Sequence, residues 1–375
     1  TEIYPLSLHD ALPICGITIG TTLTVSGGDF NVNAAIGGNF DVNGAVTLNG
    51  GTGVTLVNGL SGDLLLGTLF SDTLSISAGA FDADDVGGVV TIPGAVTITG
   101  GTGFIVDSTG GAVTLGTLAQ TTDVNVSGGA SLTITNIATN LVVNGALLLT
   151  GAGASDITLT RFASGGTVDI LEANGGFGIS ITNNDASATI DLSNFADIDV
   201  NAGGINIQQN GTLDMGEATV LEIAGAIDDD SSVNDSMILN AGVVVTLNGT
   251  GALVLDMGDA GHAADVFPNN LIIASGNYTV QDRSVDVGND LSMSNGSVDQ
   301  NAQDVIVAND FTITGGTAWN VNGAASLLDV GGNAAISLSA AGIFTINDGD
   351  VDVTGNLTFS SANANTLTVV SAGGA

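Results

Sequence analysis

The sequence predicts an all-β protein, a right-handed parallel β-helix (β-solenoid) whose coils span roughly 20–25 residues. Three observations support this prediction: the composition, a recurring strand–turn–strand segment and the absence of helical periodicity. Of the 375 residues, 44% are hydrophobic and 56 are glycine, while only 4% are aromatic. Valine, isoleucine and threonine favour strands, whereas glycine, asparagine and aspartate favour the turns between them. No window shows the i, i+3, i+4, i+7 apolar spacing of an amphipathic helix.

The recurring segment is first seen at residues 43–56, where a strand, a tight turn and a second strand follow one another. Val46 and Leu48 alternate with Thr47, as in a strand with one buried face. Three similar segments follow, at residues 93–106, 144–150 and 245–255. The segment therefore marks a structural repeat and not an isolated hairpin.

The spacing of these segments gives the period of the repeat. Ala45, Ala95 and Ala146 hold equivalent positions, 50 and 51 residues apart. We expect 50-residue repeats up to about residue 221, and each should contain two coils of about 25 residues. The whole chain should form about 16 coils and a rod about 75 Å long.

From about residue 240 the repeat shortens and is marked by corners in which a small residue precedes asparagine. These asparagines, Asn289, Asn309, Asn333 and Asn356, recur about every 20–25 residues. Asparagine tolerates the left-handed backbone of sharp corners, and stacked asparagines can hydrogen-bond along the axis of a solenoid. These four residues mark one corner of successive coils, where such a ladder could form.

The chain divides into a short N-terminal segment and one repeat domain. Residues 1–15 are predicted to be foreign or disordered, because residues 1–14 hold two of the four prolines and no glycine. Residues 1–14 resemble translated sequencing-adapter read-through, and a capping segment is the alternative. Residues 16–375 are predicted to form a single β-solenoid, with loops near 227–236 and 256–270. The second loop is expected to hold a helical turn near 260–264.

The charge balance excludes several partners. The chain has 38 acidic residues, no lysine and only two arginines, Arg161 and Arg283, which give a net charge of −36. Nucleic-acid binding requires several cationic groups, and anionic membranes attract the opposite charge. No run of 18 apolar residues is present, so we expect no membrane insertion by this segment. Cys15 is the only cysteine, which excludes a disulfide within the chain.

Calcium is the one cofactor that the sequence suggests, because hard cations bind clustered carboxylate oxygens. The candidate ligands are Asp228, Asp229, Asp230 and Asp235, and solvated turn acids are the alternative interpretation. Two further groups of acids, at residues 82–85 and 348–352, have the same character. His262 lies near Asp256, Asp259 and Asp265, where a metal or acid–base site is conceivable but an exposed loop histidine is commoner.

No catalytic residue is predicted, and the chain is not expected to be an enzyme. Polysaccharide-processing enzymes also use parallel β-helices, and a neutral glycan could be hydrolysed by two carboxylates. No spacing in the sequence singles out such a pair. Ice binding is a further alternative, because the Thr-x-Thr pairs at 97–99, 133–135, 158–160 and 312–314 could order water if they stacked in rows.

The Gly/Asn corners, the Thr-Ile-Thr-Gly-Gly runs at 97–101 and 312–316, and the scarcity of lysine and cysteine carry a family resemblance. Residues 16–375 resemble bacterial surface β-solenoid proteins of the filamentous-haemagglutinin and autotransporter-passenger adhesin type. The resemblance implies a structural or adhesive role in a long secreted or cell-surface protein, associated with the outer membrane. It implies host-cell or surface glycans and proteins, or other repeat proteins, as partners.

Overall fold

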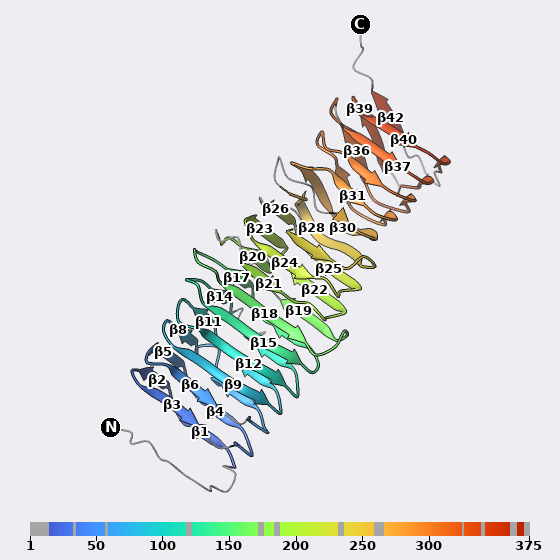
Figure 1. The fold of residues 1–375 in the computed structure, drawn as a ribbon. Helices are drawn as coiled ribbons and strands as arrows, with labels where there is room; N and C mark the ends of the chain where they lie inside the picture. Colours follow the sequence, from blue (N-terminus) through green and yellow to red (C-terminus); the bar gives the residue numbers. More distant parts are fainter. Residues whose placement is uncertain are drawn as a thin grey trace.

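The protein is a rod of stacked β-coils in the computed structural model, with the first strand, β1 (Ile17–Ile19), and the last strand, β42 (Thr366–Val370), at opposite ends (Figure 1). The structure describes residues 15–32, 35–56, 59–117, 122–171, 176–183, 188–231, 236–258, 266–324, 326–338, 342–360 and 366–370.

The described residues form a parallel β-solenoid of about 13 turns with roughly 24 residues per coil, and they contain no helix. The predicted fold class is confirmed, while right-handed coiling stays a prediction. Individual coils depart from this mean length in both directions. The coil from Val168 to its partner Ile198 is an example.

Each coil contributes one strand to each of three faces. The first face stacks β1 (Ile17–Ile19), β4 (Phe40–Val42), β7 (Leu64–Leu66), β10 (Val90–Ile92), β13 (Val113–Leu115), β16 (Leu141–Val143), β19 (Thr167–Leu171), β22 (Asp197–Ala202), β25 (Val220–Ile223), the first parts of β28 (Val244–Asp256) and β30 (Asn270–Gln281), and then β32 (Leu291–Met293), β35 (Phe311–Ile313), β38 (Ala334–Ile336) and β41 (Leu357–Phe359).

The second face is continuous with the first, because β28 and β30 run through the corner between them. It stacks β2 (Leu23–Ser26), β5 (Val46–Gly50), β8 (Leu74–Ile76), β11 (Val96–Ile98), β14 (Val124–Val126), β17 (Leu147–Leu149), β20 (Ile179–Ile181), β23 (Ile205–Gln209), β26 (Ile227–Ser231), the last parts of β28 and β30, and then β33 (Ser297–Asp299), β36 (Ala318–Asn322), β39 (Ile343–Asn347) and β42 (Thr366–Val370).

The third face is divided into two sheets. The nine-stranded sheet holds β3 (Asp29–Val32), β6 (Gly53–Leu56), β9 (Ala80–Val86), β12 (Gly103–Thr109), β15 (Ser131–Ile137), β18 (Asp156–Arg161), β21 (Thr189–Asp191), β24 (Thr212–Met215) and β27 (Met237–Leu239). The five-stranded sheet holds β29 (Val266–Phe267), β31 (Val285–Val287), β34 (Val305–Val307), β37 (Leu327–Val330) and β40 (Asp350–Val353).

The pairing register confirms that the longer sequence repeat is a double coil. On the second face Val46 pairs with Leu74, Leu74 with Val96, Val96 with Val124, and Val124 with Leu147. The steps that start at Val46 and Val96 are long, and those that start at Leu74 and Val124 are short. Because long and short coils alternate from Val46 to Leu147, the sequence there repeats clearly every two coils. The next step, from Leu147 to Ile179, is longer and breaks the 50-residue period before residue 221.

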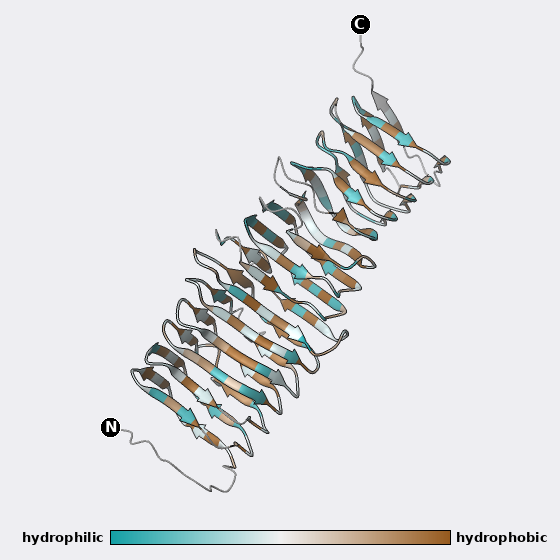
Figure 2. Cartoon of the chain, viewed as in Figure 1, coloured by the Kyte–Doolittle hydropathy of each residue, from teal (hydrophilic) through white to brown (hydrophobic). Residues whose placement is uncertain are grey.

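The core runs along the axis and is shared between neighbouring coils. Most three-residue strands bury their first and third side chains, as in Val96–Ile98, and brown and teal alternate along the strands in Figure 2. Stacked aromatic rings add to the aliphatic core: the rings of Phe81 and Phe104 stack at a centroid distance of 5.2 Å, with 23° between their planes. Burial of one valine or leucine contributes about 1.5–3 kcal/mol. Since no coil covers its own apolar face, stability depends on the neighbouring coils.

A ladder of side chains follows the corner that precedes the first face in the C-terminal part. The Oδ1 atom of each member accepts a hydrogen bond from the backbone N–H of the next. These bonds join Asn270 to Asp290 at 3.2 Å, Asp290 to Asp310 at 3.0 Å, Asp310 to Asn333 at 2.7 Å and Asn333 to Asn356 at 3.1 Å. The ladder ties each corner to the next coil, so part of the acidity of the chain is structural.

Hydrogen bonding of stacked asparagines along the axis is confirmed, and aspartates take part in it as well. Asn309 Nδ2 donates to Asn289 Oδ1 at 3.4 Å and to Asp290 Oδ1 at 2.8 Å, and Asn289 Nδ2 donates to Asn270 Oδ1 at 2.8 Å. The pairing of Leu291 with Phe311 decides the register. In both coils the residue directly before the strand is an aspartate, and its Oδ1 atom accepts the backbone N–H of the next coil.

The expected loops need correction as well. Residues 227–231 do not leave the solenoid but form β26, which pairs with β23 in register. The polar sequence conceals a strand because Ile227, Asp229 and Ser231 all point inward and are buried. In the second predicted loop, Asp256 ends β28 and Val266–Phe267 forms β29. The helical turn expected near 260–264 lies outside the described residues, as do residues 1–14 of the N-terminal segment.

Candidate functional site

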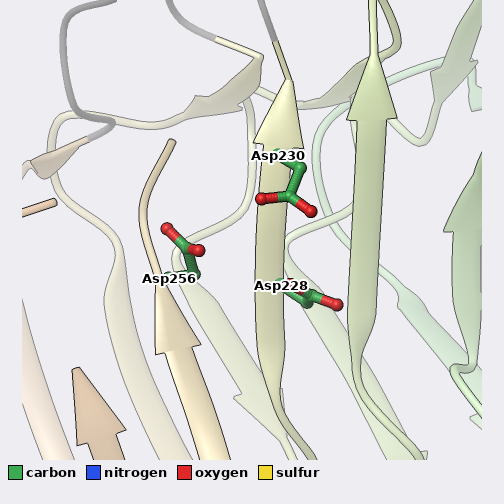
Figure 3. A group of neighbouring side chains, drawn as sticks. All are labelled: Asp228, Asp230 and Asp256. Atoms are coloured by element: carbon green, nitrogen blue, oxygen red, sulfur yellow. The ribbon is translucent and has the colours of Figure 1, made fainter. Parts of the chain in front are cut away.

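A cluster of three carboxylates lies on the second face, where β26 meets the end of β28. Figure 3 shows Asp228 and Asp230 on β26, with Asp256 on the neighbouring chain segment. One carboxylate oxygen from each of the three residues lies within 4.8 Å of the other two. Among the described residues, no other group of three histidine, cysteine, aspartate or glutamate side chains lies close enough together to hold a metal ion.

The register of the coils brings these residues together. Ile227 pairs with Leu255, so Asp228 and Asp256 are lateral neighbours although a whole coil separates them along the chain. Asp230 joins them because residues i and i+2 of a strand point to the same side. Stacked coils are about 4.8 Å apart, which is the distance that places carboxylates within reach of one cation.

Asp256 is the unusual member of the cluster. Its side chain is 1% exposed, and its Oδ1 atom has no hydrogen-bond partner among the described residues. Burial and then the neighbouring Asp282, Asp230 and Asp228 raise the pKa of Asp256 to about 8. Burial and the acids around it also raise the pKa of Asp228. At neutral pH the crowded acids therefore favour the protonated form of Asp256, whose carboxyl also hydrogen-bonds to Asp282, and a bound proton or cation offsets their mutual repulsion.

The structure brings together only part of the predicted calcium set. Asp228 and Asp230 point to the cluster, but Asp229 points into the rod and is 1% exposed. Its Oδ1 accepts from the Ser231 N–H at 2.9 Å, and its Oδ2 from the Ser236 hydroxyl at 2.5 Å. Asp229 therefore has a structural role, because strand alternation sends it to the opposite face from its neighbours. Asp235 lies outside the described residues.

The third member of the cluster, Asp256, was absent from that predicted set. In the sequence it was grouped with His262, Asp259 and Asp265, which all lie outside the described residues. A signal did exist, because the interval from Asp228 to Asp256 equals that of a long coil, such as the step from Val46 to Leu74. This interval could not identify Asp256 from the sequence, because the sequence does not show which coils are long.

A second acidic group forms a row on the first face. Asp169 pairs with Asp199, and Asp199 pairs with Glu222, so three acids stack on successive coils. Burial and then Asp197, Glu222 and Asp169 raise the pKa of Asp199 to about 6. Beside this row, the Oδ1 atom of Asp197 is buried without a hydrogen-bond partner among the described residues.

This row makes stability depend on pH. The folded-state pKa of Asp199 lies above its unfolded value, so between about pH 4 and pH 6 the native state binds more protons. Stability should therefore fall as pH rises through this window. We expect Asp199→Asn to raise the free energy of unfolding at pH 7 by about 1–2 kcal/mol, after a discount for partial exposure. The difference should vanish near pH 4, as measured by urea unfolding at both values. Equal gains at both pH values would contradict this account.

The threonines considered for ice binding do not form long rows in the described residues. Thr133 stacks on Thr158, but Thr97 stacks on Ser75 and Asn125. Thr312 stacks on Ser292 and Ala335. The rows are mixed because these outward positions vary from coil to coil.

Comparison of the chain with protein-family models, curated proteins and solved structures finds no match. The fold therefore defines the class on its own geometry: the chain is a parallel β-solenoid repeat protein. No helix within the described parts of the chain is long and apolar enough to cross a membrane.

Proposed function

We propose that the chain is a structural segment of a secreted or cell-surface repeat protein, a stiff stalk that holds binding surfaces away from the cell. The observation that carries this proposal is the continuous stacking of the coils: strands of the first face pair without interruption from β1 to β41. Nearest-neighbour packing of this kind extends a rod without a limit on its length. A rod of about 13 turns measures about 60 Å at the usual spacing of strands.

The surface of the rod is compatible with this role. A net charge of −36 keeps such rods apart in solution through mutual repulsion. The large apolar side chains with the highest exposure, Phe162 at 82% and Leu69 at 59%, lie in turns between strands. Turns on a rigid scaffold are the usual positions of binding residues, so these two are the first candidates for contacts with host-cell or surface partners.

The geometry of the acidic cluster favours a structural role over glycan hydrolysis. Paired carboxylates at roughly 5 Å with different pKa values are also found in glycosidases. A catalytic acid must reach the glycosidic oxygen, however, and Asp256 is 1% exposed. The same burial suits a carboxylate that binds an ion within the wall of the rod.

Antibodies raised against residues 16–375 provide the test of this function. We expect them to label intact, unpermeabilised cells that express the gene, or to detect the protein in the culture medium. Labelling only after permeabilisation, with nothing in the medium, would overturn the proposal.

A further inference from the structure

The second face carries a column of polar side chains that passes through the acidic cluster. Ser180 pairs with Asn206, and Asn206 pairs with Asp228. Asp256 follows beside Asp228 and pairs in turn with Gln281. Five successive coils thus present an oxygen-bearing side chain at one position. All five side chains are on paired strands, so the column is built by the fold.

Two oxygens of this column are buried without a donor. Asp256 Oδ1 has no hydrogen-bond partner within the described residues, and neither has Asn206 Oδ1. The Asn206 amide donates to the Ser180 hydroxyl at 3.1 Å, which leaves its oxygen unused. A buried oxygen without a partner is destabilising by about 1–3 kcal/mol, and by more when it carries charge. In the pairing register, Asn206 and Asp256 are the neighbours of Asp228 on the two adjacent coils.

The charges of the cluster all have one sign. The carboxylates of Asp228, Asp230 and Asp256 converge, with one oxygen of each within 4.8 Å of the other two. A bound cation would neutralise this charge and give Asp256 Oδ1 a partner. The spacing fits, because two oxygens that each lie 2.3–2.6 Å from one calcium ion are at most about 5 Å apart. The three carboxylate oxygens of the cluster meet this condition, because each lies within 4.8 Å of the other two.

The position of the cluster indicates what the ion would do. β26 pairs with β23 through five residues but with β28 through only one, Ile227 with Leu255. After this junction, β28 again pairs extensively with β30. The second face is therefore weakly joined at one step, and the cluster lies across that step.

We propose that the carboxylates of Asp228, Asp230 and Asp256 bind a calcium ion that joins the coil of β26 to the coil of β28, with Asn206 Oδ1 as a further ligand. Calcium is the cation that these residues fit, since all the donors are oxygens and the flexible geometry of the ion tolerates ligands from separate coils. Magnesium requires near-octahedral geometry and retains its waters. The proposal concerns this chain alone and holds whether or not the protein is displayed on cells.

The test is a titration of calcium into the full chain after chelator treatment, with binding measured by isothermal titration calorimetry. The wild-type chain should bind calcium at this site, and Asp256→Asn should weaken that binding at least about tenfold because the number of charged ligands sets the affinity. The matched control is Asp199→Asn, which removes one acid from the other row and should leave calcium affinity unchanged. Equal affinity in the wild type and Asp256→Asn would overturn the proposal.

Two further measurements distinguish a built site from general screening of charge. Calcium should raise the thermal midpoint of the wild type more than magnesium or sodium chloride at the same ionic strength. It should also slow amide hydrogen exchange in residues 227–231 and 252–256, and Asp256→Asn should lose this protection. If Asp256→Asn does not fold, as judged by far-UV circular dichroism, Asp228→Asn serves in its place. An equal effect of all three salts, or protection spread evenly along the rod, would overturn the proposal.

Discussion

Replacement of Trp319 by alanine is expected to destabilise the C-terminal coils by about 3–5 kcal/mol. Trp319 is fully buried, and its ring meets that of Phe311 edge-on at a centroid distance of 4.8 Å. Trp319 pairs with Val298 of the preceding coil and with Phe344 of the following coil. Truncation therefore opens a cavity that three successive coils share. Urea unfolding followed by far-UV circular dichroism measures the loss, since Trp319 is the only tryptophan.

The matched variant is Trp319→Phe, which keeps an aromatic ring in the core. The indole N–H of Trp319 has no partner among the described residues, so phenylalanine removes an unsatisfied donor while it loses some volume. We expect a loss below about 1.5 kcal/mol. Because a solenoid opens locally, hydrogen exchange should increase most between residues 297 and 347 in the alanine variant. Similar losses in both variants would show that this site does not depend on packing.

Gly103→Ala is expected to disrupt the junction between three coils on the third face. Gly103 has a φ of +108°, and it pairs with Ala80 on one side and Ser131 on the other. A Cβ added at Gly103 would lie 1.8 Å from the Ser131 carbonyl oxygen. The variant therefore combines backbone strain with a steric clash that only movement of the main chain can relieve. We expect a loss of roughly 2–5 kcal/mol, measured as the shift of the urea midpoint.

Gly27→Ala is the control for this substitution. A Cβ at Gly27 meets no atom within 4 Å, and its φ is not in the left-handed region. We expect a change within about 0.5 kcal/mol. If Gly27→Ala were as destabilising as Gly103→Ala, the close approach of the coils at Gly103 would not be the reason.

The sequence was sufficient to predict the solenoid because its signals are local or strictly periodic. Alternation such as Val46, Thr47 and Leu48 fixes which side chains face the core. The equivalence of Ala45 and Ala95 fixes the double coil, which the register reproduces two coils apart. Where a signal was less regular the prediction failed, as at Ile227–Ser231, where buried Asp229 and Ser231 gave a strand the appearance of a loop.

The sequence by itself thus determined the fold class, the length of the repeat and the acidic character of the rod. Only the tertiary structure decided which acids meet. Asp228 and Asp230 are neighbours in the sequence, but their contact with Asp256 depends on the length of the coil that leads from Ile227 to Leu255. Coil length varies widely, from the short step between Leu271 and Leu291 to the long step between Val168 and Ile198. Corner lengths set the register, and the register brings a buried carboxylate from one coil beside two acids of the coil before it.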